Sequence, residues 1–109
     1  MASKKYGYVL TEKAEADINE TFEYIAFDLS NADAAEAFID EFESIINETC
    51  KAPKTGRRVD NEYLKRDDVY RFLVNNYIAY YLIDEATHNV VVLRVVYGGR
   101  DQDKILKNI

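Results

Sequence analysis

The sequence predicts a single α+β domain over residues 1–109, in the order β-α-α-β-β-β(-α). Two amphipathic helical stripes fill the first half of the chain, and β-rich runs separated by short polar turns fill the second half. A chain of 109 residues is long enough for one hydrophobic core without disulfides. We therefore expect a curved antiparallel sheet with the N-terminal helix hairpin packed on one face and the other face free to bind a partner.

The N-terminal half predicts a strand followed by two helices. Residues 6–10 alternate as a strand does, and Thr11 is placed to cap the helix that follows. Ser30-Asn31 interrupts the first helix and caps the second, and so short a turn predicts antiparallel neighbours. The expected core stripes are Ala14, Ile18, Phe22, Ile25 and Leu29, then Ala35, Phe38, Ile39, Phe42, Ile45, Ile46 and Thr49.

The C-terminal half predicts a loop and three strands. Residues 51–68 are expected to form the loop, with a short helical turn near residues 61–65. Asn75-Asn76 tolerates positive φ, which predicts a two-residue type I′ hairpin. The tail fits either a short helix capped by Asp101 or a frayed end. The expected strands are Val69–Val74, Tyr77–Ile83 and Val90–Tyr97.

Charge is distributed unevenly along the chain, whose net charge is −6. Residues 1–50 carry three Lys and twelve acidic groups, a balance of −9, whereas residues 51–109 carry eleven basic and eight acidic groups, a balance of +3. Such a dipole can orient a partner, but it argues against tight nonspecific binding of nucleic acid by the whole surface.

Several function classes lack support in the sequence. No secretory signal is visible after Met1, and no apolar run is long enough to span a bilayer. The single Cys50 fits a reducing compartment, so we expect a soluble cytoplasmic domain. Metal-ligand spacing, a glycine-rich phosphate loop and a Ser-His-Asp arrangement are absent from the sequence, and we expect no metal or cofactor.

Basic and aromatic residues on the predicted sheet are the candidate binding residues. The hairpin register places Arg71 beside Tyr80, on the face opposite Tyr81. Arg71 fits a cationic binding surface or a pair with a nearby carboxylate equally well. For Arg94, inside an apolar strand, a structural ion pair is favoured, because buried charges are normally paired. Whether Arg71 and Arg94 meet depends on the order of the strands in the sheet.

Two further groups of basic residues have alternative interpretations. Arg100 follows Gly98-Gly99, so it fits a binding role or a salt bridge with Asp101 or the acidic helices. A second group lies in loop sequence among acidic residues and fits a solvated mixed-charge surface: Arg57, Arg58, Lys65 and Arg66.

Short motifs over nearly the whole chain make it similar to a known family. They are Tyr6-Gly7-Tyr8-Val9-Leu10-Thr11, Asp17-Ile18, Tyr24-Ile25, Ala37-Phe38, Gly56-Arg57, Tyr70-Arg71, Tyr77-Ile78-Ala79-Tyr80-Tyr81 and Leu93-Arg94-Val95-Val96-Tyr97-Gly98-Gly99-Arg100-Asp101. In this order and spacing they resemble the RelE/ParE superfamily of toxins from type II toxin–antitoxin, or plasmid stabilisation, systems. The resemblance implies the helix hairpin on a curved sheet, the same architecture that the residues predict.

The resemblance implies two possible activities. RelE-like members cleave mRNA in the ribosomal A site with Lys, Arg and Tyr or His side chains on the concave sheet face, whereas ParE-like members lack that set and poison DNA gyrase. Arg71 and Arg100 match basic positions of the ribonucleases, but their other positions fall on Leu73, Tyr77 and Leu106. Cleavage needs a group that activates the ribose hydroxyl and cations that stabilise the developing charge. The resemblance is therefore more ParE-like.

Three hypotheses follow from the resemblance. The first is a ParE-like toxin that binds a macromolecular target, possibly DNA gyrase. The second is a ribosome-dependent endoribonuclease using Arg71, Tyr97 and Arg100, and the third is an inactive antitoxin-binding relative. In each, a cognate antitoxin is the expected partner in a hetero-oligomer, with a basic arm to match the acidic helices. The target- or antitoxin-binding residues are expected to be Arg57, Arg71, Tyr80, Arg94 and Arg100.

Overall fold

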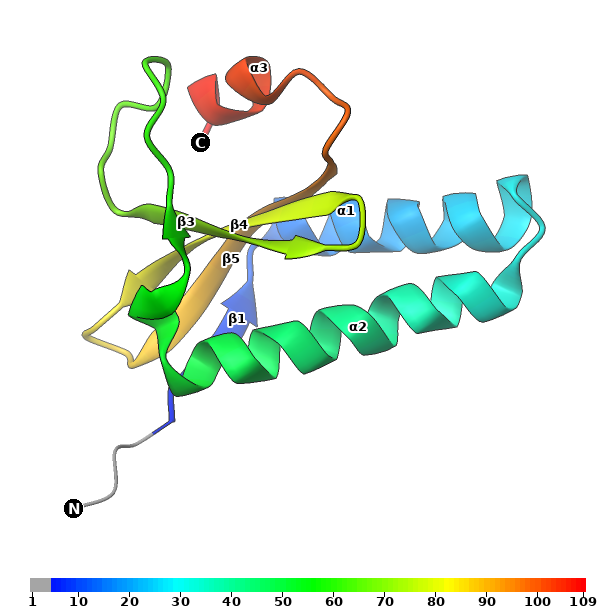
Figure 1. Cartoon of the computed structure of the whole chain (residues 1–109), viewed down its shortest axis with the longest axis horizontal. Coiled ribbons are helices and arrows are strands. Elements are labelled where there is room, and N and C mark those ends of the chain that lie inside the picture. The colour runs from blue at the N-terminus through cyan, green and yellow to red at the C-terminus, as the bar shows by residue number, and fades with distance from the viewer. Residues whose placement is uncertain (1–4) are drawn as a thin grey trace.

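A computed structural model describes residues 5–109 and confirms the α+β class with its N-terminal helix hairpin (Figure 1). The five strands form one sheet in the order β1-β5-β4-β3-β2. The elements are β1 (Gly7–Leu10), α1 (Glu12–Glu23), the π-helical segment η1 (Tyr24–Asp28), α2 (Ala32–Lys51), the 3-10 turn η2 (Pro53–Thr55), β2 (Arg57–Arg58), β3 (Val69–Val74), β4 (Tyr77–Asp84), β5 (Asn89–Tyr97) and α3 (Gln102–Lys107).

The helix hairpin begins and turns where the capping residues predict. The Thr11 hydroxyl accepts a hydrogen bond from the Ala14 amide at 3.1 Å, and the Asn31 side chain accepts one from the Ala34 amide at 3.0 Å. The π-helical turns of η1 rotate the end of the first stripe out of the core. Leu29, expected in that stripe, is therefore 54% exposed, and this part of the prediction is wrong.

The structure confirms the predicted β3–β4 hairpin and corrects four details. Val74 pairs with Tyr77, so the turn holds two residues, but of these only Asn75 has positive φ, which excludes type I′. The strand β1 pairs parallel to β5, whereas we expected an antiparallel sheet throughout. The short strand β2 lies in the predicted loop, and residues 61–65 form a turn without helix.

Two apolar clusters lie on opposite faces of the sheet. The larger one packs both helices of the hairpin against residues such as Ala79, Tyr81 and Val92. Burial raises the pKa of the Tyr81 hydroxyl to about 12, and this hydroxyl donates to the Pro53 carbonyl at 2.7 Å. The smaller cluster joins Ile78, Tyr80 and Val96 to Ile105 and Leu106 of α3.

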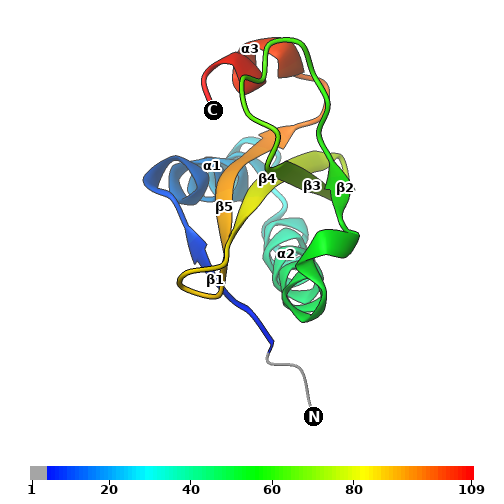
Figure 2. The same ribbon diagram turned by 90° about the vertical axis from the view of Figure 1, so that its left-hand side faces the viewer.

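The helix α3 lies over the sheet face that was expected to be free (Figures 1 and 2). The Asp101 side chain accepts from the Lys104 amide at 3.3 Å, which starts this helix and resolves the two interpretations of the tail. Leu64 from the loop also packs on this face. The expectation of a bare second face is therefore wrong in its centre, because the apolar side chains there are sheltered from water by the chain's own C-terminal segment.

The edge of β5 that β1 leaves unpaired is completed by Thr11, which caps the first helix, and by Asp17 within that helix. Beyond the end of β1, the Thr11 amide and hydroxyl donate to the Val92 and Leu93 carbonyls at 3.0 Å each. One oxygen of the Asp17 carboxylate then accepts from the Val95 amide, also at 3.0 Å. These contacts fix the first helix to β5, the strand between β1 and β4.

Candidate functional site

Four of the six candidate residues lie in one row across the sheet. Arg57 of β2 pairs with Arg71 of β3, Arg71 pairs with Tyr80 of β4, and Tyr80 pairs with Arg94 of β5. Directly paired residues on neighbouring strands share a face. Because β4 lies between β3 and β5, Tyr80 separates Arg71 from Arg94, and the two arginines are not neighbours.

The β5 end of this row is neutralised within the chain. The Arg94 guanidinium binds the Asp17 carboxylate through two hydrogen bonds, of 2.7 and 3.0 Å. The side chains of Arg94 and Asp17 are only 18% and 9% exposed, and Asp17 raises the pKa of the Arg94 guanidinium. The structure thus gives Arg94 the ion pair that its apolar strand favoured.

Tyr80, in the middle of the row, is covered by α3. Only 2% of the residue is exposed, and its hydroxyl donates to the Gln102 side chain at 2.7 Å. Burial raises the pKa of Tyr80, and the positive charge of Arg71 partly offsets this rise. The Tyr80 ring belongs to the smaller core, and its role in binding a target or antitoxin stays a prediction.

The β2 end of the row carries charge without a counter-ion. Within residues 5–109, Arg57 and Arg71 form no ion pair with an acidic side chain. Both arginines line a cleft of about 290 Å³ together with Tyr80 and Gln102. This cleft is the cationic part of the row.

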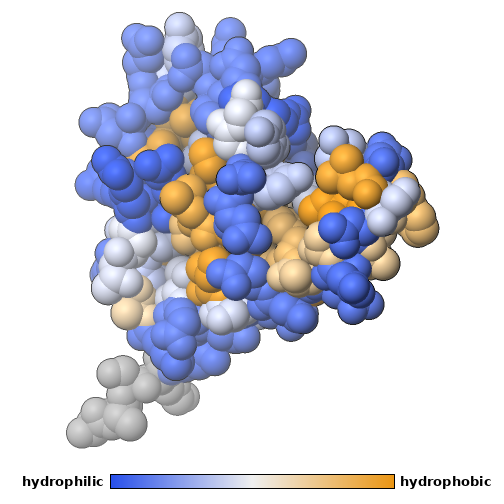
Figure 3. Space-filling view, turned by 45° about the vertical axis from the view of Figure 1, so that its right-hand side comes forward, coloured by the Kyte–Doolittle hydropathy of each residue, from blue (hydrophilic) through white to orange (hydrophobic). Residues whose placement is uncertain are grey.

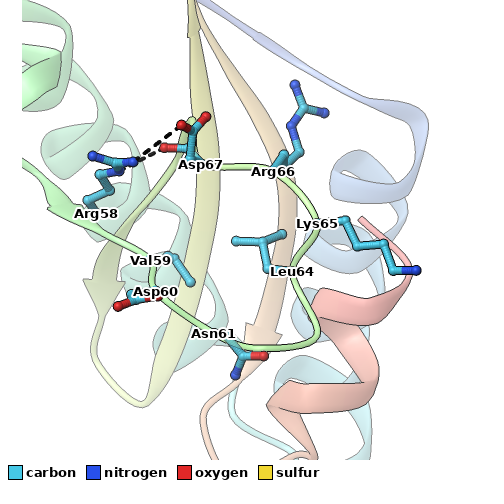
Figure 4. A pocket seen from close by; sticks show the side chains of 8 residues that line it. All are labelled: Arg58, Val59, Asp60, Asn61, Leu64, Lys65, Arg66 and Asp67. Atoms are coloured by element: carbon cyan, nitrogen blue, oxygen red, sulfur yellow. Dashed lines mark hydrogen bonds and ion pairs between the residues drawn. The ribbon is translucent and has the colours of Figure 1, made fainter.

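The loop after β2 has the expected mixed-charge character (Figure 4). The Arg58 side chain crosses the base of the loop to Asp67, where it binds the backbone carbonyl at 2.7 Å and the carboxylate at 3.6 Å. Arg66 pairs with Asp68 at 2.5 Å. Because these partners neutralise Arg58 and Arg66, the loop contributes little net charge to the cleft beside it.

Tyr97 and Arg100 lie in a different hollow, at the end of β5. It is a groove of about 710 Å³ between the end of the helix hairpin and the β3–β4 turn, and it also includes Tyr24, Leu29 and Tyr77. Tyr97 is 50% exposed and contacts Tyr77 edge to face, with ring centroids 5.7 Å apart. We call this hollow the hairpin groove.

The hairpin groove combines exposed aromatic and aliphatic side chains with charged residues along its edges. Tyr24 and Leu29 are 49% and 54% exposed, and Phe27 beside them is 72% exposed. Figure 3 shows apolar surface, in orange, on the protruding end of the helix hairpin. Glu20 lines the groove with negative charge and Arg100 with positive charge. Exposed aromatic and aliphatic side chains rimmed by charges are typical of protein-binding surfaces.

A glycine pair shapes the wall of this groove. The Gly98 amide donates to the Asn76 carbonyl at 2.7 Å, and a Cβ atom on Gly99 would overlap the Tyr97 ring. The absence of side chains therefore allows the chain to turn sharply between Tyr97 and Arg100. Arg100 forms no ion pair within the described residues, and Asp101 caps α3 instead of binding it.

The structure does not bring the three candidate ribonuclease residues together. Tyr97 shares the helix face with Tyr77, whereas Arg71 shares the opposite face with Tyr80. Arg71 and the pair Tyr97–Arg100 line separate hollows. Two of the positions that differ from the ribonucleases are Leu73, which is 56% exposed, and Leu106 of α3, which is only 3% exposed and packs in the smaller cluster.

The described part of the chain shows neither a metal-binding cluster nor a membrane-spanning helix. Residues 5–109 contain no group of three or more His, Cys, Asp or Glu side chains placed to hold a metal ion. None of the helices in this range has both the length and the apolar character needed to cross a membrane. Cys50 is buried in the larger core, and this burial raises the pKa of its thiol.

Both the cross-sheet row and the hairpin groove include residues that the sequence analysis did not select. Gln102 holds Tyr80 and donates to the Tyr97 and Arg100 carbonyls at 3.1 and 3.0 Å, so it links the row to the hairpin groove. Asp17 has a signal in the sequence, because it is an acidic residue three positions after Ala14, beside the apolar stripe. The exposure of Leu29 had no such signal, since it depends on the π-helical turns.

The fold and the two sites define a small α+β protein in which a helix hairpin packs on a five-stranded sheet and both candidate sites are surface hollows. Residues 8–102 match the family model described as "ParE toxin of type II toxin-antitoxin system, parDE". Because the match spans most of the chain, this protein belongs to the ParE toxin family.

Solved structures are similar in fold. The chain is similar to one from the chromosomal ParDE toxin–antitoxin system of P. aeruginosa, with a TM-score of 0.68, 14% identity and coverage of 87% of this chain and 98% of that one. It is also similar to one from the RelBE2 toxin–antitoxin complex of Mycobacterium tuberculosis, with a TM-score of 0.60, 19% identity and coverage of 86% and 99%. No curated protein matches the sequence.

Proposed function

We propose that this ParE-type toxin inhibits growth by binding a macromolecular target, with DNA gyrase as the first candidate, and that a cognate antitoxin neutralises it. The observation that carries the proposal is the separation of Arg71 from Tyr97, which lies on the opposite face of the sheet, and from Arg100, which lines a different hollow. Acid–base cleavage of RNA requires its groups to converge on one phosphate. Binding through a surface has no such requirement.

An antitoxin partner is supported by the two similar structures, since both come from toxin–antitoxin systems. The hairpin groove supplies a surface of the right chemistry for it. Because Tyr24 and Leu29 are exposed, we expect the antitoxin to place apolar side chains against them. Because residues 1–50 have an acidic balance, we expect basic residues of the antitoxin between those apolar side chains. An antitoxin arm that folds on binding can cover such a surface.

Controlled expression tests this proposal. Expression of the chain alone is expected to arrest growth, and co-expression of the small reading frame adjacent to its gene is expected to restore growth. Failure to arrest growth, with the folded chain present in the cell, would indicate an inactive antitoxin-binding relative. Cleavage of mRNA in the arrested cells, lost in Arg100→Ala, would instead indicate a ribonuclease.

Truncation of one aromatic side chain tests the groove. Tyr24→Ala is expected to weaken antitoxin binding by about tenfold or more, because half-exposed aromatic side chains often anchor interfaces. Binding is measured by calorimetry at two salt concentrations, and weaker binding at high salt is expected for a basic arm.

The matched control is Tyr63→Ala, which removes another partly exposed tyrosine, 41% exposed, from the loop after β2. It is expected to change the affinity by less than roughly twofold, as most residues outside a binding centre do. Equal losses from the two variants would show that the antitoxin does not use the hairpin groove.

A further inference from the structure

The pairing of Arg57 with Arg71 breaks a rule that the rest of the sheet follows. Like charges directly opposite each other on neighbouring strands destabilise the sheet. Arg94 in the same row is neutralised by Asp17, and Arg58 and Arg66 beside it are neutralised by the loop. Local features that cost stability without an internal compensation concentrate at functional sites.

The two arginines line a hollow that is already polar. The cleft of about 290 Å³ has the Tyr80 hydroxyl and Gln102 on its inner side and Asn61 on its loop side. Tyr80 and Gln102 are held in place by their mutual hydrogen bond of 2.7 Å, so this inner side is fixed before any ligand arrives. Asp60 also lines the cleft, is exposed and forms no ion pair within the described residues.

The geometry points to a binding site for a carboxylate. We propose that the cleft between Arg57 and Arg71 binds an acidic side chain from an extended segment of a protein partner. Guanidinium groups form charge-assisted, often bidentate hydrogen bonds with carboxylates. A bound carboxylate would replace the repulsion between the two arginines with two attractions. This site goes beyond the proposed toxicity and does not depend on it.

The surroundings favour a protein segment over a nucleic acid. Phosphate chains bind along tracks of clustered cations, whereas this cleft offers two cations without counter-ions, next to Asp60, on a chain of net charge −6. The edge of the sheet supports the same choice. β2 is the last strand in the sheet order, so its outer backbone groups can pair with an extended peptide. Acidic residues at alternate positions of that peptide would face Arg57 and Arg71.

Peptide binding to the intact chain tests the inference. The probe is a fluorescent peptide of alternating Glu and Thr residues, and its counterpart has Gln in place of each Glu. Saturable binding of the Glu peptide alone is expected, weakened about tenfold or more in Arg57→Gln and in Arg71→Gln. Lys54→Gln removes one exposed positive charge three residues before Arg57 in the sequence and is expected to change binding by less than roughly twofold.

Thermal melting supplies the folding control and a second readout. Arg57→Gln and Arg71→Gln are expected to melt at the same temperature as the parent or slightly above it, because each removes a like-charge contact. The Glu peptide is expected to raise the melting temperature of the parent and leave that of the two variants unchanged.

Three results would overturn the assignment. One is equal binding of the Gln peptide, and another is an equal loss of affinity in Lys54→Gln. The third is a single-stranded RNA oligonucleotide that binds more tightly than the Glu peptide and loses affinity in the same two arginine variants, which would make the cleft a nucleic-acid interface. None of these results depends on whether the chain arrests growth.

Discussion

Asp17→Ala is expected to lower the free energy of unfolding by about 3 kcal/mol, more than other single charge removals in this chain. The substitution leaves the Arg94 guanidinium, whose side chain is 18% exposed, without its carboxylate. It also removes the acceptor of the buried Val95 amide, at the edge of β5 that β1 leaves unpaired. Both losses leave polar groups in a partly buried place where water replaces the carboxylate poorly. Urea unfolding followed by circular dichroism measures the change.

Two variants separate this contact from general effects of charge. Glu23→Ala removes another acidic residue of the same helix, one that is exposed, and is expected to change stability by less than about 0.5 kcal/mol. Asp17→Asn keeps an acceptor for the Val95 amide and is expected to fall between the two. A loss in Glu23→Ala as large as that in Asp17→Ala would contradict the structural role of the Asp17–Arg94 pair.

Gly56→Ala is expected to destabilise the fold by about 2–3 kcal/mol although it adds a single methyl group. That methyl group would overlap the Tyr81 hydroxyl oxygen. Tyr81 cannot move aside, because it is 0% exposed and its hydroxyl donates to the Pro53 carbonyl at 2.7 Å. Relief of the overlap would require either the loss of this buried hydrogen bond or a shift of the segment after α2. Thermal and urea unfolding both report the loss.

A double-mutant cycle tests the cause. Tyr81→Phe alone is expected to cost about 1–2 kcal/mol, because it leaves the Pro53 carbonyl without its donor. With the hydroxyl absent, Gly56→Ala is expected to cost less than in the parent, since the nearest remaining ring atom, Cζ, lies 3.0 Å from the new methyl position. An equal cost in both backgrounds would show that Gly56 is needed for another reason.

Local sequence signals predicted the elements of this fold well. Thr11, Asn31 and Asp101 each cap the helix that follows, as their side-chain chemistry predicts. The two-residue turn at Asn75-Asn76 is sufficient to predict the β3–β4 register, and with it the pairing of Arg71 with Tyr80. These features depend on residues close together in the chain.

Long-range packing accounts for what the sequence did not predict. The parallel pairing of β1 with β5 joins residues about eighty positions apart. The residues of the two strands do not indicate whether the strands pair parallel or antiparallel. Arg57 could not be placed in the cross-sheet row, because β2 has only two residues and lies in loop-like sequence. The covering of Tyr80 by α3 depends on where the tail docks. The sequence therefore predicted the individual candidate residues, but it did not predict how these residues lie relative to one another.

The most direct test of the target proposal compares two reactions of the purified chain. With DNA gyrase, ATP and supercoiled plasmid, we expect cleaved DNA to accumulate and supercoiling activity to fall, and equimolar antitoxin to abolish both effects. In a translation extract, the same preparation is expected to leave mRNA intact. Cleavage of mRNA at the ribosome, with gyrase unaffected, would contradict the proposal.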